Sequence, residues 1–267
     1  METLYIIINV LAALALVSAG ALLHRVWKKS TQKAEIQSQK LKQQMTSNIA
    51  HELRTPVTSI RGYLETIIAC PDMSDEKKLV FIEKAYNQTL RLSELITDMA
   101  LITKMEERSE KLRTEEVDLY DVVNEVFDEF ESRIAEKGNI VENKLSAGTF
   151  LIANRTLVYT IVRNLVENTL KYAGDGVTMH IECYSTIEKY CYITYYDTGA
   201  GVPEDHLEKI FERFYRIDEG RARDVGGSGL GLSIVKNAVK FHGGTVRVIN
   251  RLEGGLQFFF SLRRQND

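Results

Sequence analysis

The chain reads SNIAHELRTP over residues 47–56, a stretch that predicts a helix carrying one exposed histidine. Apolar residues recur there at helical spacing, whereas His51 and Thr55 stand four residues apart on another face. Because Pro56 has no N–H, the carbonyl of Glu52 loses its helical partner, and the helix should bend one turn after His51. A bend beside a titratable side chain suggests a functional position.

Two alternatives apply to His51. A single histidine on a helix is most often a surface residue without a chemical role. A zinc protease would need the pattern His-Glu-x-x-His, with a second imidazole one turn later. Thr55 occupies that position, so the sequence excludes a zinc site of this kind. The choice between a surface residue and a reactive one depends on the rest of the chain.

Length and charge narrow the class of protein. With 267 residues the chain has room for one membrane span, a small helical domain and one α/β domain. The formal net charge of −3 argues against a surface for polyanions, and therefore against direct nucleic-acid binding. Cys70, Cys183 and Cys191 form no Cys-x-x-Cys pair, which predicts reduced, mostly structural thiols in the cytosol.

Residues 4–23 form an almost wholly apolar run of about twenty positions, enough to span the core of a bilayer. Only residues 1–3 precede this run, and basic residues follow it within 24–29. The positive-inside rule therefore places the N-terminus outside and the rest of the chain in the cytoplasm. A cleaved signal peptide is the alternative, since residues 18–21 are small, but the basic n-region is absent. We expect a single-pass membrane anchor.

A helical hairpin is expected next. The polar residues 24–44 predict a solvated helical linker into the His51 helix, which should continue to residue 69. Cys-Pro-Asp-Met at 70–73 breaks this helix, and Ser74 is a good N-cap for the next one. The second helix, over 75–105, carries an apolar stripe of Leu79, Ile82, Ala85, Tyr86, Leu90, Ser93, Ile96, Thr97 and Ala100. Two helices with one stripe each cannot bury both stripes alone, so two hairpins should pair as a four-helix bundle in a homodimer.

After a charged linker at residues 106–116, strands alternate with helices. The pattern predicts helices over 119–137, 154–173 and 228–242, with Asn154 as the N-cap of the second. It predicts strands over 140–145 and 149–153, as a pair, and over 177–184, 190–196, 245–250 and 256–262, the last two as a hairpin. The C-terminal half, residues 117–265, is therefore predicted to be an α/β domain.

Two clusters in this domain carry side chains suited to a nucleotide. Asn164, Asn168 and Lys171 share one helical face, where two amides and an ammonium could hold hydrated magnesium and a phosphate. A plain polar helix face is the alternative. Asp197 follows a strand and precedes glycines that permit close backbone approach, which suits recognition of an exocyclic amine such as adenine N6. The pattern Asp-x-Gly-x-Gly is, however, also common in turns.

Two further clusters follow. The aromatic residues of 211–216 precede a polar run at 218–225, which predicts a mobile lid held at its base. The glycine-rich residues 226–232 open a helix whose exposed N–H groups and dipole would attract phosphates. This run is neither a Rossmann fingerprint nor a Walker loop, because it does not follow a first strand and contains no Gly-Lys-Ser/Thr.

In this order and spacing, the five elements resemble the H, N, G1, F and G2 boxes of bacterial sensor histidine kinases. The resemblance covers the cytoplasmic part from about Thr46 to the C-terminus. It implies an all-α helical hairpin at residues 45–105 that dimerises as a four-helix bundle for phosphotransfer. It also implies an ATP-binding α/β two-layer sandwich of the GHKL ATPase type at residues 117–265, and one N-terminal transmembrane helix in the bacterial inner membrane.

The resemblance implies roles for individual residues. His51 corresponds to the phosphoacceptor that attacks ATP, Glu52 to the residue that accepts the imidazole proton, and Thr55 to a position associated with phosphatase activity. The implied partner is a response regulator, whose receiver domain takes the phosphoryl group on an aspartate. The implied ATP and Mg²⁺ site comprises Asn164 and Asn168 at the metal, Lys171 at a phosphate, Tyr172 beside the nucleoside, Asp197 at the adenine with Gly199 and Gly201, and Gly227, Gly229 and Gly231 around the phosphates.

The chain departs from the family pattern in a few places. Thr169 stands where alanine is frequent, and Thr198 replaces a usual asparagine; we expect neither side chain to carry the chemistry. The short stretch before His51 leaves no room for a HAMP-type relay, so the signal input is unexplained. The remaining histidines match no box, and we expect structural or surface roles for His24, His180, His206 and His242.

Two other classes of protein stay open. A catalytically silent scaffold could signal by dimerisation, and the absence of Mg-ATP binding would favour it. An ATPase clamp would turn over ATP without forming a phosphoprotein, but a His51 hairpin would have no purpose in it.

Overall fold

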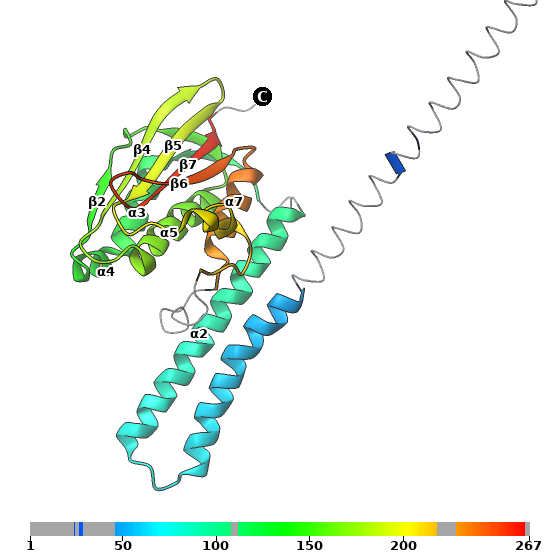
Figure 1. Ribbon diagram of the computed structural model, residues 1–267, viewed down its shortest axis with the longest axis vertical. Coiled ribbons are helices and arrows are strands. Elements are labelled where there is room, and N and C mark those ends of the chain that lie inside the picture. Colours follow the sequence, from blue (N-terminus) through cyan, green and yellow to red (C-terminus); the bar gives the residue numbers. More distant parts are fainter. Residues whose placement is uncertain (1–23, 25–26, 29–45, 108–111, 218–227, 265–267) are drawn as a thin grey trace, which may run out of the picture. The chain divides into compact units, whose positions relative to one another are not determined.

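The computed structural model describes residues 24, 27–28, 46–107, 112–217 and 228–264 of the chain (Figure 1). The chain divides into two compact units, Met1–Thr55 and Pro56–Asp267, and each is described by itself. The predicted membrane span at 4–23 and the polar run at 218–225 lie outside the described residues, as does most of the linker at 24–44. Among the described residues, no helix combines the length and apolar character needed to cross a bilayer.

The predicted helical hairpin is present. Residues 46–69 are helical, and α2 spans Asp75–Glu106 after a short turn. Ser74 caps α2 as expected, because its hydroxyl accepts a first-turn backbone N–H at 3.5 Å. The rings of Tyr63 and Phe81 meet across the hairpin, with their centroids 5.9 Å apart.

Most of the predicted apolar stripe of α2 remains exposed in this single chain. The residues Leu79, Ile82, Tyr86 and Ile96 are 57%, 51%, 62% and 55% exposed, whereas Ala85 is buried. Contiguous exposed apolar surface on a soluble helix is typical of an interface with another protein surface.

A five-stranded sheet forms the centre of the C-terminal domain, in the order β2-β4-β5-β7-β6. Strand β2 runs parallel to β4, and the other neighbours are antiparallel. The strands are β2 (Ile140–Asn143), β4 (Thr178–Ile187), β5 (Tyr190–Asp197), β6 (Val246–Asn250) and β7 (Leu256–Arg263). The expected hairpin of the last two strands is confirmed.

The expected pairing of the first two strands is wrong. Strand β2 pairs with β4, whereas β3 (Phe150–Ala153) pairs with β1 (Glu115–Asp118), which begins inside the stretch predicted as linker. The side chain of Asn143 at the end of β2 donates to Asn124 Oδ1 at 2.9 Å. This bond links the end of β2 to helix α3 (Leu119–Glu129), and β3 belongs to a separate two-stranded sheet with β1.

Helices cover one face of the large sheet (Figure 1). They are α3 (Leu119–Glu129), α4 (Glu131–Glu136), α5 (Arg155–Tyr172) and α7 (Gly231–Phe241), with the 3-10 turns η1 (Glu204–His206) and η2 (Lys209–Phe211) before α7. The single helix expected over 119–137 is divided at Phe130, whose φ of −96° and ψ of 5° leave the helical region. Helix α5 packs between α3 and α7, with Asn154 as its N-cap as predicted. The result is the predicted two-layer α/β sandwich.

Candidate functional site

A cavity of about 780 Å³ brings together residues of α2, α5, α7 and the end of β5. Most of the residues predicted to bind nucleotide line it: Asn164, Asn168, Lys171, Tyr172, Asp197, Gly201, Gly229 and Gly231. The Gly199 N–H donates to Asp197, which lines the cavity, and Gly227 lies outside the described residues. Side chains distant in sequence therefore meet at one site, as the sequence predicts.

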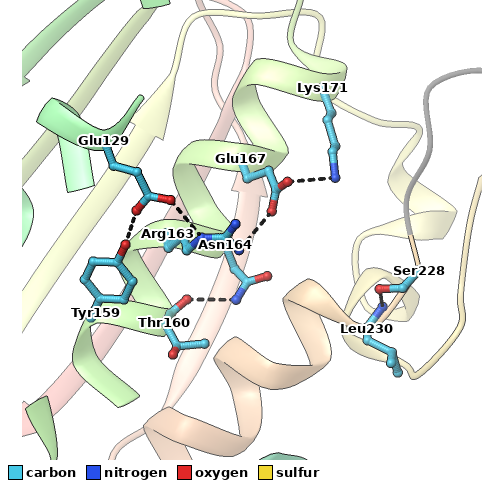
Figure 2. Close-up of polar contacts among 9 residues, drawn as sticks. All are labelled: Glu129, Tyr159, Thr160, Arg163, Asn164, Glu167, Lys171, Ser228 and Leu230. Carbon is cyan, nitrogen blue, oxygen red and sulfur yellow. Dashed lines mark hydrogen bonds and ion pairs between the residues drawn. The ribbon is translucent and has the colours of Figure 1, made fainter. Parts of the chain in front are cut away.

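Helix α5 supplies the amide face of the cavity (Figure 2). The amide nitrogen of Asn164 donates to the Thr160 carbonyl at 2.8 Å, which leaves Oδ1 as its outward-facing polar atom. A Cβ on Gly231 would come within 2.6 Å of that oxygen. Gly231 is therefore needed because α7 begins directly against Asn164.

The Glu167 carboxylate holds the cationic side chains of Lys171 and Arg163 in place on this helix. Its carboxylate lies 3.0 Å from Lys171 Nζ and 3.5 Å from Arg163 Nη1, and Figure 2 shows all three groups on one side of α5. Arg163 also contacts Glu129 at 3.4 Å, and Glu129 accepts a hydrogen bond from Tyr159. This network fixes the direction of Lys171, the predicted phosphate ligand, and the sequence reasoning did not identify it.

Helix α2 contributes an acidic side chain to the same wall. Burial raises the pKa of Asp98 from its ordinary 3.8 to about 6, against the lowering effect of the nearby Arg163 cation. The charges of Glu94 and Glu167 raise this pKa further, whereas Lys171 lowers it. The wall of the cavity therefore carries a carboxyl that titrates in the weakly acidic range.

Asp197 is the most enclosed charged group of the site, with 2% of its surface exposed. Its Oδ1 accepts the backbone N–H of Gly199 at 2.9 Å and that of Leu256 at 3.4 Å. Burial raises the pKa of Asp197, and these donors, with the Thr169 hydroxyl and the Arg251 cation, act in the opposite direction. The result is a buried carboxylate held in one orientation at the cavity.

Glycines let the backbone fold tightly around Asp197. A Cβ on Gly199 would meet Ala173 at 2.5 Å, and one on Gly201, whose φ is +70°, would meet Asn250 at 2.6 Å. Gly255, which the sequence reasoning missed, has a φ of +90°, and a Cβ there would lie 1.9 Å from the Asp197 carbonyl oxygen. Gly199 and Gly201 thus let the backbone beside Asp197 pack closely against Ala173 and Asn250, and their predicted role toward a ligand stays a prediction.

Within the described part of the glycine-rich stretch, Gly229 packs against the aromatic segment before it. The Phe214 N–H donates to the Gly229 carbonyl at 2.9 Å, and both residues have positive φ, +63° and +68°. A Cβ on Gly229 would lie 2.8 Å from the Phe214 backbone. Helix α7 begins at Gly231, three residues later than predicted, and Leu230 provides no side-chain cap. The first N–H groups of α7 are therefore well placed to bind an anion at the cavity.

The side chains at the cavity suit Mg²⁺ better than a metal ion whose ligands all come from the protein. Within the described residues, no group of three or more His, Cys, Asp or Glu side chains is arranged to hold an ion. Mg²⁺ prefers oxygen ligands and keeps several waters, so one or two protein oxygens together with phosphates suffice. The amide oxygens of Asn164 and Asn168 on the cavity wall could supply this contribution.

The His51 helix belongs to the first unit and is described separately. The His51 side chain is 72% exposed, and its Nδ1 lies 3.9 Å from Glu52 Oε1. The hydroxyl of Thr55 donates to the His51 carbonyl at 3.3 Å, which confirms that both residues lie one turn apart on the same face. An exposed imidazole with a carboxylate at one nitrogen is available for reaction at the other.

Sequence reasoning missed the residues that support Asp197 from behind. Thr169 was expected to carry no chemistry, but its buried hydroxyl lies 3.3 Å from Asp197 Oδ2. Arg251 lies over the Tyr196 ring at 4.1 Å and donates to the Asp197 carbonyl at 3.3 Å. A polar residue at a buried helical position, as Thr169 is, was the available signal for the first of these. Arg251 comes from a distant hairpin, so no local pattern could find it.

Comparisons with known proteins give the same result for both domains. Residues 41–108 match the family described as His Kinase A (phospho-acceptor) domain. Residues 153–266 match the family of histidine kinase-, DNA gyrase B-, and HSP90-like ATPases. Sensor histidine kinase RppB of Synechocystis is 33% identical over 85% of this chain and 50% of its own length. Sensor histidine kinase WalK of Bacillus subtilis is 30% identical over 77% of this chain and 34% of its own. The chain thus spans between a third and a half of these curated relatives.

Solved structures agree. The histidine kinase AdeS of Acinetobacter baumannii superposes with a TM-score of 0.65 and 27% identity, covering 81% of this chain and 98% of that chain. The histidine kinase ThkA, in complex with response regulator protein TrrA, gives 0.63 and 25%, covering 83% of this chain and 61% of that one. With both domains matched and the nucleotide boxes gathered at one cavity, the chain belongs to the bacterial two-component sensor histidine kinases.

Proposed function

We propose that this chain is an ATP-dependent protein-histidine kinase that phosphorylates itself on His51. The observation that carries the proposal is the cavity in which buried Asp197 meets Asn168, Lys171 and the start of α7. These groups provide, in one place, a base-recognising carboxylate, ligands for a hydrated metal and two sources of positive charge for phosphates.

In the proposed complex, Asp197 accepts a hydrogen bond from the adenine amino group and Tyr172 lies beside the nucleoside. Asn164 and Asn168 bind Mg²⁺, which would neutralise charge on the phosphates. Lys171, oriented by Glu167, binds a phosphate together with Gly229 and Gly231 at the start of α7. We assign Gly227 to the same phosphate loop from its place in the sequence.

The position of Glu52 beside His51 supports an assignment of which imidazole nitrogen attacks ATP. Because Nδ1 is the nitrogen near Glu52, the proton leaves from Nδ1 toward that carboxylate while Nε2 attacks the γ-phosphorus. A P–N bond forms, the bond to the β-phosphate oxygen breaks, and ADP leaves with the electron pair. The high exposure of His51 suits a group that must reach both ATP and a second protein.

The acceptor for the next step is an aspartate on a response regulator. The ThkA structure was solved in complex with a response regulator, and this chain resembles it across most of its length. Transfer from His51 to an aspartate releases the imidazole and forms an acyl phosphate. A chain with one histidine acceptor needs such a partner to pass on the signal.

We propose a phosphatase activity of the same helix, through Thr55. Its hydroxyl lies one turn from His51 and could orient a water against the phosphorylated aspartate of a docked regulator. Thr55→Ala should keep the autophosphorylation rate and slow regulator dephosphorylation roughly tenfold, the usual size of a lost positioning contact. Dephosphorylation at the wild-type rate would remove Thr55 from this role.

A homodimer anchored in the bacterial inner membrane completes the proposal. The exposed stripe of α2 supports dimerisation, since pairing two hairpins would bury it as a four-helix bundle. The apolar residues 4–23 support a single-pass anchor with the catalytic domains in the cytoplasm.

Incubation with γ-labelled ATP tests the proposed kinase. The full chain should take up label only with Mg²⁺, and the product should be labile to acid and stable to base, as a phosphoramidate is. Release of inorganic phosphate from ATP without label on the protein would instead indicate an ATPase clamp. A chain that binds no Mg-ATP would indicate a scaffold.

A further inference from the structure

Three buried polar groups form a line behind the base-recognition carboxylate. The Tyr195 hydroxyl lies 2.8 Å from Thr169 Oγ1, which lies 3.3 Å from Asp197 Oδ2. Their exposed fractions are 0%, 1% and 2%. Tyr195 and Asp197 stand two positions apart in strand β5 and so share one face of the sheet, whereas Thr169 comes from α5. The line therefore joins the two layers of the domain.

The direction of the hydrogen bonds in this line follows from chemistry. A carboxylate only accepts, so the Thr169 hydroxyl must give its single proton to Asp197. Thr169 Oγ1 is then an acceptor, and Tyr195 must donate to it. Burial raises the pKa of Tyr195 above its ordinary value, which keeps this hydroxyl protonated as a donor.

The hydrogen bonds that Asp197 already accepts determine how many of its lone pairs remain for a ligand. Oδ1 already accepts two backbone N–H groups, from Gly199 and Leu256, which fill its two lone pairs. Oδ2 accepts one bond from Thr169 and keeps one lone pair. Since Asp197 lines the cavity, that remaining acceptor is what the site offers to a base.

We propose that Thr169, supported by Tyr195, is a positioning residue that fixes Asp197 as a pure acceptor and so selects a 6-aminopurine base. This inference rests on the proposed nucleotide-binding function. A carboxyl that rotated or took up a proton could also donate, and a donor would tolerate the 6-oxo group of other purines.

The substitution Thr169→Val keeps the shape of the side chain and removes only the hydroxyl. It should weaken binding of Mg-ATP roughly tenfold, the size expected for one buried hydrogen bond to a charged group. Purine riboside triphosphate lacks the 6-amino group, so its affinity should change less than about twofold in the same variant. Thr169→Ser, which restores the hydroxyl, should recover ATP affinity.

Tyr195→Phe and Thr156→Val complete the set. Tyr195→Phe removes the donor behind Thr169 and should produce a smaller, base-dependent loss of roughly threefold, as expected for a neutral hydrogen bond. Thr156 lies on the exposed side of the same helix, so Thr156→Val should leave both affinities unchanged. Calorimetric titration of the full chain with each nucleotide measures all of these effects.

The outcomes separate this inference from the proposed function. Wild-type chain that bound neither nucleotide would overturn the kinase assignment and the inference with it. The inference alone would be overturned if the wild-type chain bound ATP and Thr169→Val weakened the binding of both nucleotides equally. It would also be overturned if Thr169→Val weakened the binding of neither nucleotide. A base-dependent loss in Tyr195→Phe would sustain it even if Thr169→Val failed to fold.

Discussion

Gly255 lies directly against Asp197, the carboxylate that we propose recognises the base. A Cβ at this position would lie 1.9 Å from the Asp197 carbonyl oxygen and 2.8 Å from its Oδ1. Its φ of +90° also favours glycine over any other residue. Any side chain at this position must therefore displace Asp197, strain the backbone or do both.

Gly255→Ala should lower the free energy of unfolding by about 2–4 kcal/mol, combining backbone strain with overpacking. It should also weaken Mg-ATP binding at least roughly tenfold, because the carboxylate moves. Gly174→Ala is the matched control, since Gly174 also has a positive φ, +103°, but a Cβ there would meet nothing within 4 Å. Chemical unfolding and nucleotide titration check both. Equal losses of ATP affinity in the two variants would contradict the close-approach role.

Residues that line the cavity could be predicted from the sequence more readily than the residues that support them from behind. Asp197 and Asn164 could be predicted because strand ends and helix faces have regular spacing. Gly255 and Arg251 act on Asp197 from more than fifty positions away in the chain. Their roles depend on how β7 and the preceding turn meet β5, and no local periodicity encodes that approach.

Among the elements, α2 combines two functions, because it carries part of the exposed stripe and also lines the cavity. Asp98 is the titratable group of α2 whose pKa this position shifts. Its pKa is raised from 3.8 to about 6, mainly by burial. A folded-state pKa above the unfolded one means that the folded chain binds more protons between these values. The stabilisation is therefore complete below about pH 4 and is lost as the pH rises through about 6.

Asp98→Asn should remove this dependence. The shift corresponds to about 3 kcal/mol, and the remaining solvent contact of the side chain reduces the expected effect to about 1–2 kcal/mol. The variant should be more stable than the wild type by that amount at neutral pH and equal to it near pH 4. Asp72→Asn, exposed in the turn before α2, is the control. Unfolding curves with the same pH slope in wild type and Asp98→Asn would contradict the assignment.

Element predictions succeeded where periodicity was long and failed where the elements were short. Helix α5, with its cap at Asn154, and the hairpin of β6 and β7 lie close to where they were expected. Strand β1 has four residues, of which three are charged, so its pattern resembles a linker. The partner of β2 could not be predicted from adjacency, because β2 pairs in parallel with β4, and both β3 and α5 lie between them in the chain.

For the whole molecule, the expected assembly is a dimer through α2. Ile82 belongs to the exposed stripe and is 51% exposed in the single chain. In a symmetric dimer each substitution counts twice, so Ile82→Glu should weaken dimerisation at least roughly 100-fold by losing two buried side chains. Glu83→Gln, one residue away and exposed, should leave it intact. Sedimentation across a concentration range checks this, and an unchanged dimer in Ile82→Glu would place the interface elsewhere.

The location of the phosphoryl group after incubation with Mg-ATP tests directly whether His51 is the phosphoacceptor. Peptide mapping under basic conditions should find it on His51, and His51→Gln should abolish the label while His24→Gln, an exposed histidine outside the boxes, keeps it. Label that persists in His51→Gln, or that maps to another residue, would contradict the account.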